Sequence, residues 1–520
     1  MNPSDDRPRA RRPLDREPAL PSRVTLAPVE GRVLDPQTAI TVNGVVARST
    51  VYVGPRVLVS RSVDFDAALE VFRAVAGPLK WEVVPGPEDH RTAGLRFGVR
   101  AVELRVASGE ATLAPDGWTL IQQTRAQFGN DAVRGVGLEH VVHSRGVNPY
   151  PIEMTHPVEM SHPVEMSHPF EMSHPVATYG LPGQGGRQPV AYVGPPPYRH
   201  DDAELTGRRP VVAILDTGCG AHSWLDGVVD ETVTLDGRAI GYTDPATDPE
   251  EHGDLAGPLD GSIDPVSGHG TFIAGMVHQA CPDADILSWR IVPSEGPLVE
   301  SDWIAALSQV LELVSRHAEG RPGGRRIDVL SLSMGYYHET PEDELFDPTL
   351  RELLVELGRL GTIVVCSAGN DATSRPSFPA AFAPWSDADE PVDPSVVPVV
   401  SVGALNPNLR TDALFSNAGP WVRAWVPGAA VISTIPAFEG GLLPLARTQA
   451  YGRVRECIDP DDFRGGFAVW SGTSFAAPLL AGQLAAALAP SLGAPGEEVT
   501  TQDAVARAWT AIEKLTSIGR

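Results

Sequence analysis

The chain has 520 residues, which is enough for two or three domains with a sizeable hydrophobic core. Its 41 Lys and Arg residues stand against 66 Asp and Glu residues, giving a formal net charge of -25. This excess of acidic residues disfavours nucleic acid and anionic membrane surfaces as partners, and it is typical of a soluble protein. We therefore expect neither a nucleic-acid nor a membrane partner.

Residues 1–23 are rich in Arg, Pro and Asp and lack the apolar core of a secretory signal, so we expect a disordered tail. The longest apolar stretch, 479–488, is too short to span a bilayer. Together these features predict a cytoplasmic protein, with export by another route left open. Four widely spaced cysteines also favour a reducing compartment, although one disulfide pair stays an alternative: Cys219, Cys281, Cys366 and Cys457.

Residues 24–147 predict a small α+β domain. Asp64 and Asp116 each precede an amphipathic stretch, as helix-capping residues do, and Val102, Leu104 and Val106 alternate with charged residues as in a half-buried strand. Strands are expected over 51–59, 81–84, 102–106 and 138–142, with helices over 64–76 and 116–128. This β-α-β-β-α-β order is the ferredoxin-like pattern.

Residues 148–208 predict a linker. From Ile152 the chain repeats a hexapeptide four times, as IEMTHP, VEMSHP, VEMSHP and FEMSHP. The regular proline prevents a helix and favours an extended rod, and Gly and Pro continue through 180–197. One interpretation is a soft-metal site built from the repeated His and Met side chains. The other is a spacer that grew by tandem duplication.

Residues 209–520 predict an α/β domain with a mostly parallel sheet, because apolar strands alternate with helices over 302–316, 350–359 and 501–515. A buried strand ends in Asp216, and His269 lies between two glycines where a helix should begin. Ser474 lies at the start of an apolar helix over 475–488, where unpaired backbone N–H groups favour developing negative charge. A capping serine has the same position, so Ser474 alone does not indicate chemistry.

The blocks around Asp216, His269 and Ser474 occur in the order found in the subtilisin-like serine proteases, which the chain resembles over about residues 209–490. The resemblance implies a three-layer subtilisin-like domain and a serine endopeptidase with an Asp-His-Ser triad and an acyl-enzyme intermediate. It implies Asn370, in the segment IVVCSAGN, as the oxyanion donor. It also implies that peptide or protein substrates bind along one edge strand, Ser333, Met334 and Gly335.

The same resemblance bears on the rest of the chain. Small domains of this kind serve such proteases as inhibitory or folding-assisting propeptides, so residues 24–147 are expected to be an intramolecular inhibitor or else an unrelated accessory domain. No metal or other cofactor is required for catalysis. The acidic segment 244–264 is expected to be a solvated insertion, with a structural calcium site or repulsion of acidic substrates as alternatives.

Some features stay open at this level. Tyr336 stands where the family usually has glycine, and its bulk is expected to narrow a subsite. An inactive binding protein that keeps the fold is an alternative, but the full set of catalytic residue types argues against it. A metal-responsive regulator acting through the His/Met repeat is another. The natural substrate, the residue preferred before the cleaved bond and the oligomeric state are not indicated.

Overall fold

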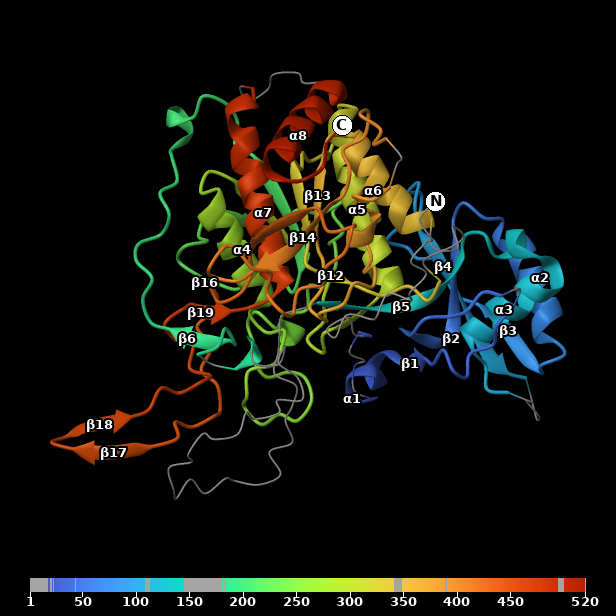
Figure 1. The fold of residues 1–520 in the computed structure, drawn as a ribbon, viewed down its shortest axis with the longest axis horizontal. Coiled ribbons are helices and arrows are strands. Elements are labelled where there is room, and N and C mark those ends of the chain that lie inside the picture. Colours follow the sequence, from blue (N-terminus) through green and yellow to red (C-terminus); the bar gives the residue numbers. More distant parts are fainter. Residues whose placement is uncertain are drawn as a thin grey trace, which may run out of the picture.

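A computed structural model describes residues 17–18, 21, 23–42, 44–107, 113–144, 179–181, 183–340, 348–388, 391–493 and 500–519. The chain forms a small α+β domain beside a larger α/β domain (Figure 1). The hexapeptide repeat with its candidate metal ligands lies outside the described residues, as does most of the tail 1–23.

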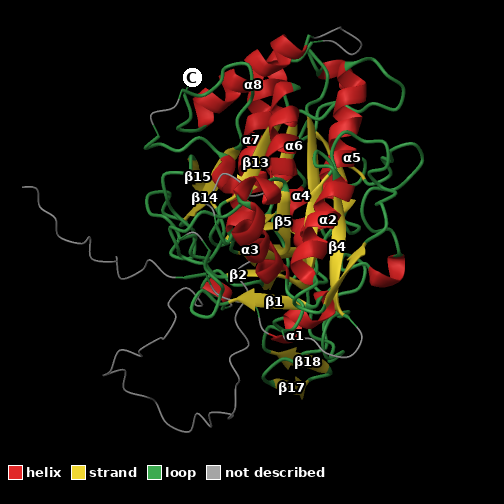
Figure 2. Cartoon of the chain, turned by 90° about the vertical axis from the view of Figure 1, so that its right-hand side faces the viewer, coloured by secondary structure: helices red, strands yellow, loops and turns green. Residues whose placement is uncertain are grey.

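The small domain has the strand and helix order expected from its sequence. Its strands β2 (Thr50–Ser60), β3 (Trp81–Pro85), β4 (Val99–Val106) and β5 (Val136–Ser144) pair antiparallel in the order β5-β2-β4-β3, which is the ferredoxin-like arrangement. Helices α2 (Phe65–Ala76) and α3 (Gly117–Phe128) begin where Asp64 and Asp116 accept backbone hydrogen bonds as N-caps. Both helices lie on the outer side of the sheet, away from the large domain (Figure 2). A short helix α1 (Arg23–Leu26) and strand β1 (Gly31–Leu34) precede them.

The large domain is built on one parallel sheet of seven strands. In chain order these are β7 (Val211–Asp216), β8 (Val229–Asp230), β9 (Asp285–Arg290), β11 (Val329–Leu332), β13 (Ile363–Ser367), β14 (Val400–Leu405) and β15 (Ala424–Pro427). In space their order is β15-β14-β13-β11-β7-β9-β8, and every pairing is parallel. A parallel sheet must be covered on both faces, which explains its continuous apolar strands.

Helices cover both faces of this sheet and give three layers. On one face, Val212 and Ile214 of β7 pack in a core with α4 (His269–Ala280), α7 (Thr473–Leu488) and α8 (Thr501–Leu515). On the other face, Ala213 and Leu215 pack in a core with α5 (Glu300–Ala318) and α6 (Pro348–Arg359). Consecutive β7 residues alternate between the two cores because strand side chains point to opposite faces.

Residues 179–208, expected to be linker, pack on the large domain. Strand β6 (Gln188–Val190) pairs with β19 (Phe467–Trp470), which in turn pairs with β16 (Val431–Thr434). The buried guanidinium of Arg187 donates to the carbonyl oxygens of Ile263, Asp264 and Ser267 at 2.6–3.0 Å. The Gly- and Pro-rich composition of this segment therefore did not indicate that it contains the three-residue strand β6, which Arg187 attaches to the large domain. An exposed hairpin, β17 (Arg447–Ala450) and β18 (Arg453–Glu456), extends from the same side (Figure 1).

The helical stretch Thr473–Ser491 is the one segment among the described residues that is long and apolar enough to cross a membrane by length and composition. Within the fold, 67% of that window is buried, and α7 forms the centre of the α4–α7–α8 core. Its apolar character is thus explained by packing. All four cysteines are free thiols, so the disulfide alternative is wrong.

Candidate active site

The structure brings Asp216 and His269 into direct contact, although 53 residues separate them in the chain. Asp216 is the last residue of β7, and His269 is the first residue of α4. His269 Nδ1 lies 2.6 Å from Asp216 Oδ1, and both side chains are buried. The same carboxylate oxygen accepts the Thr217 N–H at 2.9 Å, which fixes its orientation. The predicted pair of carboxylate and imidazole is therefore assembled at the carboxyl end of the parallel sheet.

Ser474 lies in the first turn of α7, as predicted, and is fully buried. Its neighbour Phe475 packs against the His269 ring, with ring centroids 5.3 Å apart, so the starts of α4 and α7 meet at the site. Ser474 Oγ donates to the Ser333 carbonyl oxygen at 3.2 Å, and Ser333 Oγ donates to the Ser474 carbonyl oxygen at 2.8 Å. The predicted substrate-binding segment thus touches the predicted nucleophile.

Asn370 faces the same helix end. Its Oδ1 accepts both the backbone N–H and the hydroxyl of Thr473 at 2.9 Å, so its Nδ2 is the end of the amide that can donate elsewhere. Gly369 has a φ of 109°, which favours glycine, and its N–H donates to Thr473 Oγ1 at 3.0 Å. The fully buried Asn417 braces the loop by accepting the Asp371 N–H at 3.0 Å. The loop is held rigid from both sides.

The edge that was predicted to bind substrate is occupied by the small domain. Strand β12 (Met334–Gly335) pairs antiparallel with the end of β5, with Met334 opposite Ser144 and Gly335 opposite His143. On its other side β5 pairs with β10 (Pro297–Val299), where Leu298 lies opposite Val142. Figure 1 shows β5 running out of the small domain into the large one. The end of β5, a strand of the small domain, is therefore the middle strand of the ladder β10-β5-β12, which lies beside Ser333.

A buried ionic cluster joins the two domains behind this ladder. His140 of β5 places Nδ1 at 2.6 Å from Glu300 Oε2 and Nε2 at 2.8 Å from Glu339 Oε2, both carboxylates belonging to the large domain. Burial alone lowers the pKa of His140, but the two carboxylates outweigh it and raise the pKa to about 10. The His140 ring also stacks on Tyr336 at 4.4 Å between centroids. Tyr336, expected to narrow a subsite, supports the small domain.

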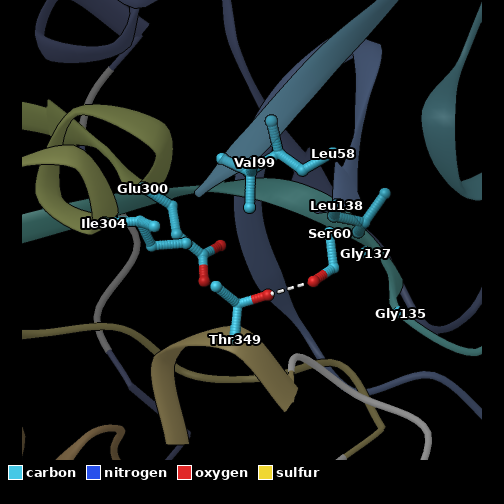
Figure 3. A pocket seen from close by; sticks show the side chains of 9 residues that line it. All are labelled: Leu58, Ser60, Val99, Gly135, Gly137, Leu138, Glu300, Ile304 and Thr349. Carbon is cyan, nitrogen blue, oxygen red and sulfur yellow. Dashed lines mark hydrogen bonds between the residues drawn. The ribbon is translucent and has the colours of Figure 1, made fainter. Parts of the chain in front are cut away.

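Two further side-chain hydrogen bonds cross the seam between the domains. Thr349 Oγ1 and Ser60 Oγ form a hydrogen bond of 2.8 Å across the domains, beside Leu138 and Glu300 (Figure 3). Thr50 Oγ1 donates to the Tyr337 carbonyl oxygen at 2.6 Å. The two domains therefore meet through specific hydrogen bonds as well as through the strand pairing.

Among the described residues, His140, His338 and Glu339 form the one group of three donors close enough to share a metal ion. Two imidazoles and a carboxylate do not suit calcium, which prefers oxygen ligands. Each ring nitrogen of His140 is already engaged by a carboxylate oxygen, one from Glu300 and one from Glu339. No group of this kind falls within the described part of the acidic segment 244–264, where Asp264 Oδ2 accepts the N–H groups of Leu255 and Ala256.

Comparison with known proteins decides the family. The family model described as "Subtilase family" (Peptidase_S8) matches residues 207–511, which is more than half of the chain. The chain belongs to the subtilase family. Subtilases of this kind are serine endopeptidases, and the three-layer α/β domain described above is the subtilisin-like fold.

Several characterised proteins resemble this subtilase. "Intracellular serine protease" of Paenibacillus polymyxa is 27% identical over 54% of this chain and 67% of its own length. "Major intracellular serine protease" of Bacillus subtilis is 25% identical over 54% of this chain and 69% of its own length. Among solved structures, fervidolysin of Fervidobacterium pennivorans, a keratinolytic enzyme, matches with a TM-score of 0.44 and 17% identity, over 84% of this chain and 55% of its own.

Two features of this subtilase site were not predicted from the sequence. Glu250, expected to be solvated with its acidic segment, is 3% exposed and lies against the Asp216–His269 pair. His140, in a strand identified only by its apolar residues, is the buried link between the domains. In both cases a single charged residue is buried by distant parts of the chain, and no local pattern marks it.

Proposed function

We propose that this subtilase hydrolyses peptide bonds with Ser474 as nucleophile, His269 as general base and then general acid, and Asp216 as the group that orients His269. The 2.6 Å contact between His269 Nδ1 and Asp216 carries the proposal, because it fixes the tautomer whose Nε2 accepts the serine proton. Attack of Ser474 Oγ on the carbonyl carbon forms the acyl-enzyme, and His269 returns the proton to the leaving amine. Water then attacks the acyl-enzyme with His269 as general base, and His269 returns the proton to Ser474 as the carboxylic acid product leaves.

Asn370 is proposed to donate from Nδ2 to the negative oxygen of the tetrahedral intermediate. Support comes from Thr473, which holds the opposite end of the amide at 2.9 Å. The backbone N–H of Ser474, at the start of α7, is the second donor. Steady-state kinetics on a chromogenic peptide test these roles: Ser474→Ala and His269→Ala should each lower kcat by about 10⁶-fold, leaving only the residual rate that binding and the oxyanion donors supply. A loss of less than about 10³-fold in either variant would contradict the assignment.

We infer that substrates bind in extended form in the place that β5 holds, between β10 and β12. Val142 of β5 is fully buried, and its neighbours Leu298 and Met334 belong to the same apolar cluster. The subsite at that position is therefore expected to prefer an aliphatic side chain. A peptide library varied at one position at a time would show this preference, and equal cleavage of Val and Asp at that position would refute it.

The small domain is proposed to be an intramolecular inhibitor, since its own strand fills the substrate edge. Ser144, the last described residue of β5, lies opposite Met334, whose chain neighbour Ser333 is the residue that Ser474 contacts. We therefore propose self-cleavage directly after this strand, at the bond between Arg145 and Gly146, which lies outside the described residues. An unrelated accessory domain would not be expected to pair one of its strands with the edge beside Ser333 and Ser474.

Incubation followed by intact-mass measurement tests this processing. Wild-type chain should yield a fragment ending at Arg145, whereas Ser474→Ala should remain whole. Gly146→Pro is a matched variant, because proline after the cleaved bond removes the N–H and restricts the backbone while leaving the active site intact. Fragments of Ser474→Ala at the same bond would show that another protease is responsible.

Two relatives are named intracellular proteases, and we propose a cytoplasmic location for this subtilase as well. The four free thiols support this, because reduced cysteines persist in that compartment. Cell fractionation with an antibody against the large domain would test it, and recovery mainly from the medium would contradict it. No cofactor is proposed for the chemical step.

A further inference from the structure

Glu250 is a buried carboxylate that the triad chemistry does not use. It lies in the acidic segment before α4 but is only 3% exposed. Its Oε1 accepts the Gly270 N–H at 3.0 Å and a short hydrogen bond from the Thr217 hydroxyl. Its Oε2 accepts the Thr271 hydroxyl at 2.5 Å. Burying a carboxylate is costly unless it is hydrogen-bonded, and here both oxygens are satisfied by the protein.

The partners of Glu250 are the chain neighbours of the catalytic pair. Thr217 directly follows Asp216, and Gly270 directly follows His269. Thr217 Oγ1 also accepts the Gly270 N–H at 2.7 Å and lies 3.2 Å from Asp216 Oδ1. One carboxylate therefore clamps the end of β7 to the start of α4, and that junction sets the contact between Asp216 and His269.

The end of β7 and the start of α4 also pack closely against each other at this junction. A Cβ at Gly270 would lie 2.0 Å from the Gly218 carbonyl oxygen, so the turn after β7 and the first turn of α4 are in backbone contact. Thr271 Oγ1 accepts the Gly220 N–H at 2.7 Å and thereby adds a second tie between the same two segments. Glu250 receives hydrogen bonds from both sides of this contact.

We propose that Glu250 is a positioning residue for the catalytic pair: its buried carboxylate, bonded to Thr217, Gly270 and Thr271, holds Asp216 and His269 at their working separation. The inference rests on the proposed roles of Asp216 and His269. When Glu250 is ionised, its Oε1 accepts a hydrogen bond from the Thr217 hydroxyl. When protonated, it donates to Thr217 Oγ1 instead, and the Thr217 hydroxyl can turn to Asp216.

The surroundings of Glu250 make this ionisation relevant near neutral pH. Burial raises the pKa of Glu250 to about 7, against the lowering effect of its hydrogen bonds from Thr217, Thr271 and Gly270, and the charge of Asp216 raises it further. The other ionisable groups around it are His269 on α4, Cys219 in the turn after β7, Glu231 after β8, Arg290 at the end of β9, and Asp248 and Glu251 on its own segment. Arg290 Nη1 lies 3.3 Å from Asp248 Oδ2, so this cation is paired with a carboxylate of the same segment as Glu250.

The test is the pH dependence of kcat/KM for the processed enzyme carrying Glu250→Gln, with active sites counted by a fluorophosphonate titrant. We expect kcat per active site to fall about tenfold, as for one lost hydrogen bond to a charged group, with KM within about twofold. The acid limb should change from two ionisations to one, because glutamine cannot ionise.

Glu251→Gln is the matched control, since it removes a charge from the exposed neighbouring residue and should leave the profile unchanged. If Glu250→Gln matches wild type in kcat per active site and in the acid limb, the inference is wrong, even if the variant is less stable. If Glu250→Gln does not fold, Thr217→Val tests the same link and should lower kcat per active site with little change in KM. Near-wild-type activity of Ser474→Ala would instead overturn the proposed function, so the two failures are distinguishable.

Discussion

Replacing His140 by alanine should loosen the small domain more than any other single change in the seam. The substitution leaves Glu300 and Glu339 buried and facing one another without the cation that both contact at 2.6 and 2.8 Å. Removing one partner from a buried ionic network costs about 3–5 kcal/mol. At about 1.4 kcal/mol for each factor of ten, the open form of the domain interface should become roughly 10²- to 10³-fold more populated.

Amide hydrogen exchange measures this opening directly. In a Ser474→Ala background the proposed self-cleavage cannot occur, so the intact chain reports only docking and undocking of β5. The Val141 and Val142 amides should exchange roughly 10²- to 10³-fold faster in the His140→Ala variant, while strands β7 and β11 stay protected. His200→Ala is the control, because His200 pairs with Asp283 on the exposed surface and such pairs contribute little. Unchanged exchange at β5 in a folded His140→Ala protein would refute the role given to this cluster.

Three further predictions follow from the same contacts. Docking should be tightest near pH 6.5. His140, whose burial is outweighed by two carboxylates that raise its pKa to about 10, stabilises the docked state below its ordinary value of 6.5, and this contribution is lost as pH rises towards about 10. His338, whose pKa burial lowers to about 4, and Glu339, whose pKa is lowered to about 2 because the two histidines outweigh its burial, lose their contributions as pH falls below 6.5 and 4.5 respectively. Exchange at β5, corrected for intrinsic rates, measures this, and a monotonic trend over pH 3–10 would contradict it. Asn370→Ala should lower kcat about 10²- to 10³-fold with little change in KM, as for the corresponding kind of donor in subtilisin; a loss below threefold would exclude it from the oxyanion site. Arg187→Ala should lower the free energy of unfolding by about 1–3 kcal/mol, because three partly buried hydrogen bonds to carbonyl oxygens are lost, whereas the exposed Arg464→Ala should change it by less than about 0.5 kcal/mol in denaturant titrations.

Local signals in the sequence were sufficient for most elements of the fold. The helix expected over 501–515 is α8 with those bounds, and the capping residues Asp64 and Asp116 mark the starts of α2 and α3. The apolar face expected on the helix over 302–316 is buried in α5, with Trp303 and Val310 fully enclosed. These features depend on periodicity and on side chains that bond to their own backbone, and both can be read within a few residues.

The remaining features depend on contacts between distant segments. Nothing near Glu250 indicates that Thr217 and Thr271 will surround it, because these residues are 33 and 21 positions away. The placement of β5 against β12 likewise joins residues nearly 200 positions apart. The resemblance to subtilases located the residues of the catalytic blocks, but it did not indicate which residues of this chain hold those blocks together.

The most direct test of the central claim is to map the covalent adduct of a fluorophosphonate probe by peptide mass spectrometry. One modified residue is expected, Ser474, with labelling that is lost in Ser474→Ala and strongly slowed in His269→Ala. Labelling should also be faster in the processed enzyme than in Gly146→Pro, whose small domain stays attached. An adduct on another serine, or undiminished labelling of Ser474→Ala, would contradict the assignment of the nucleophile.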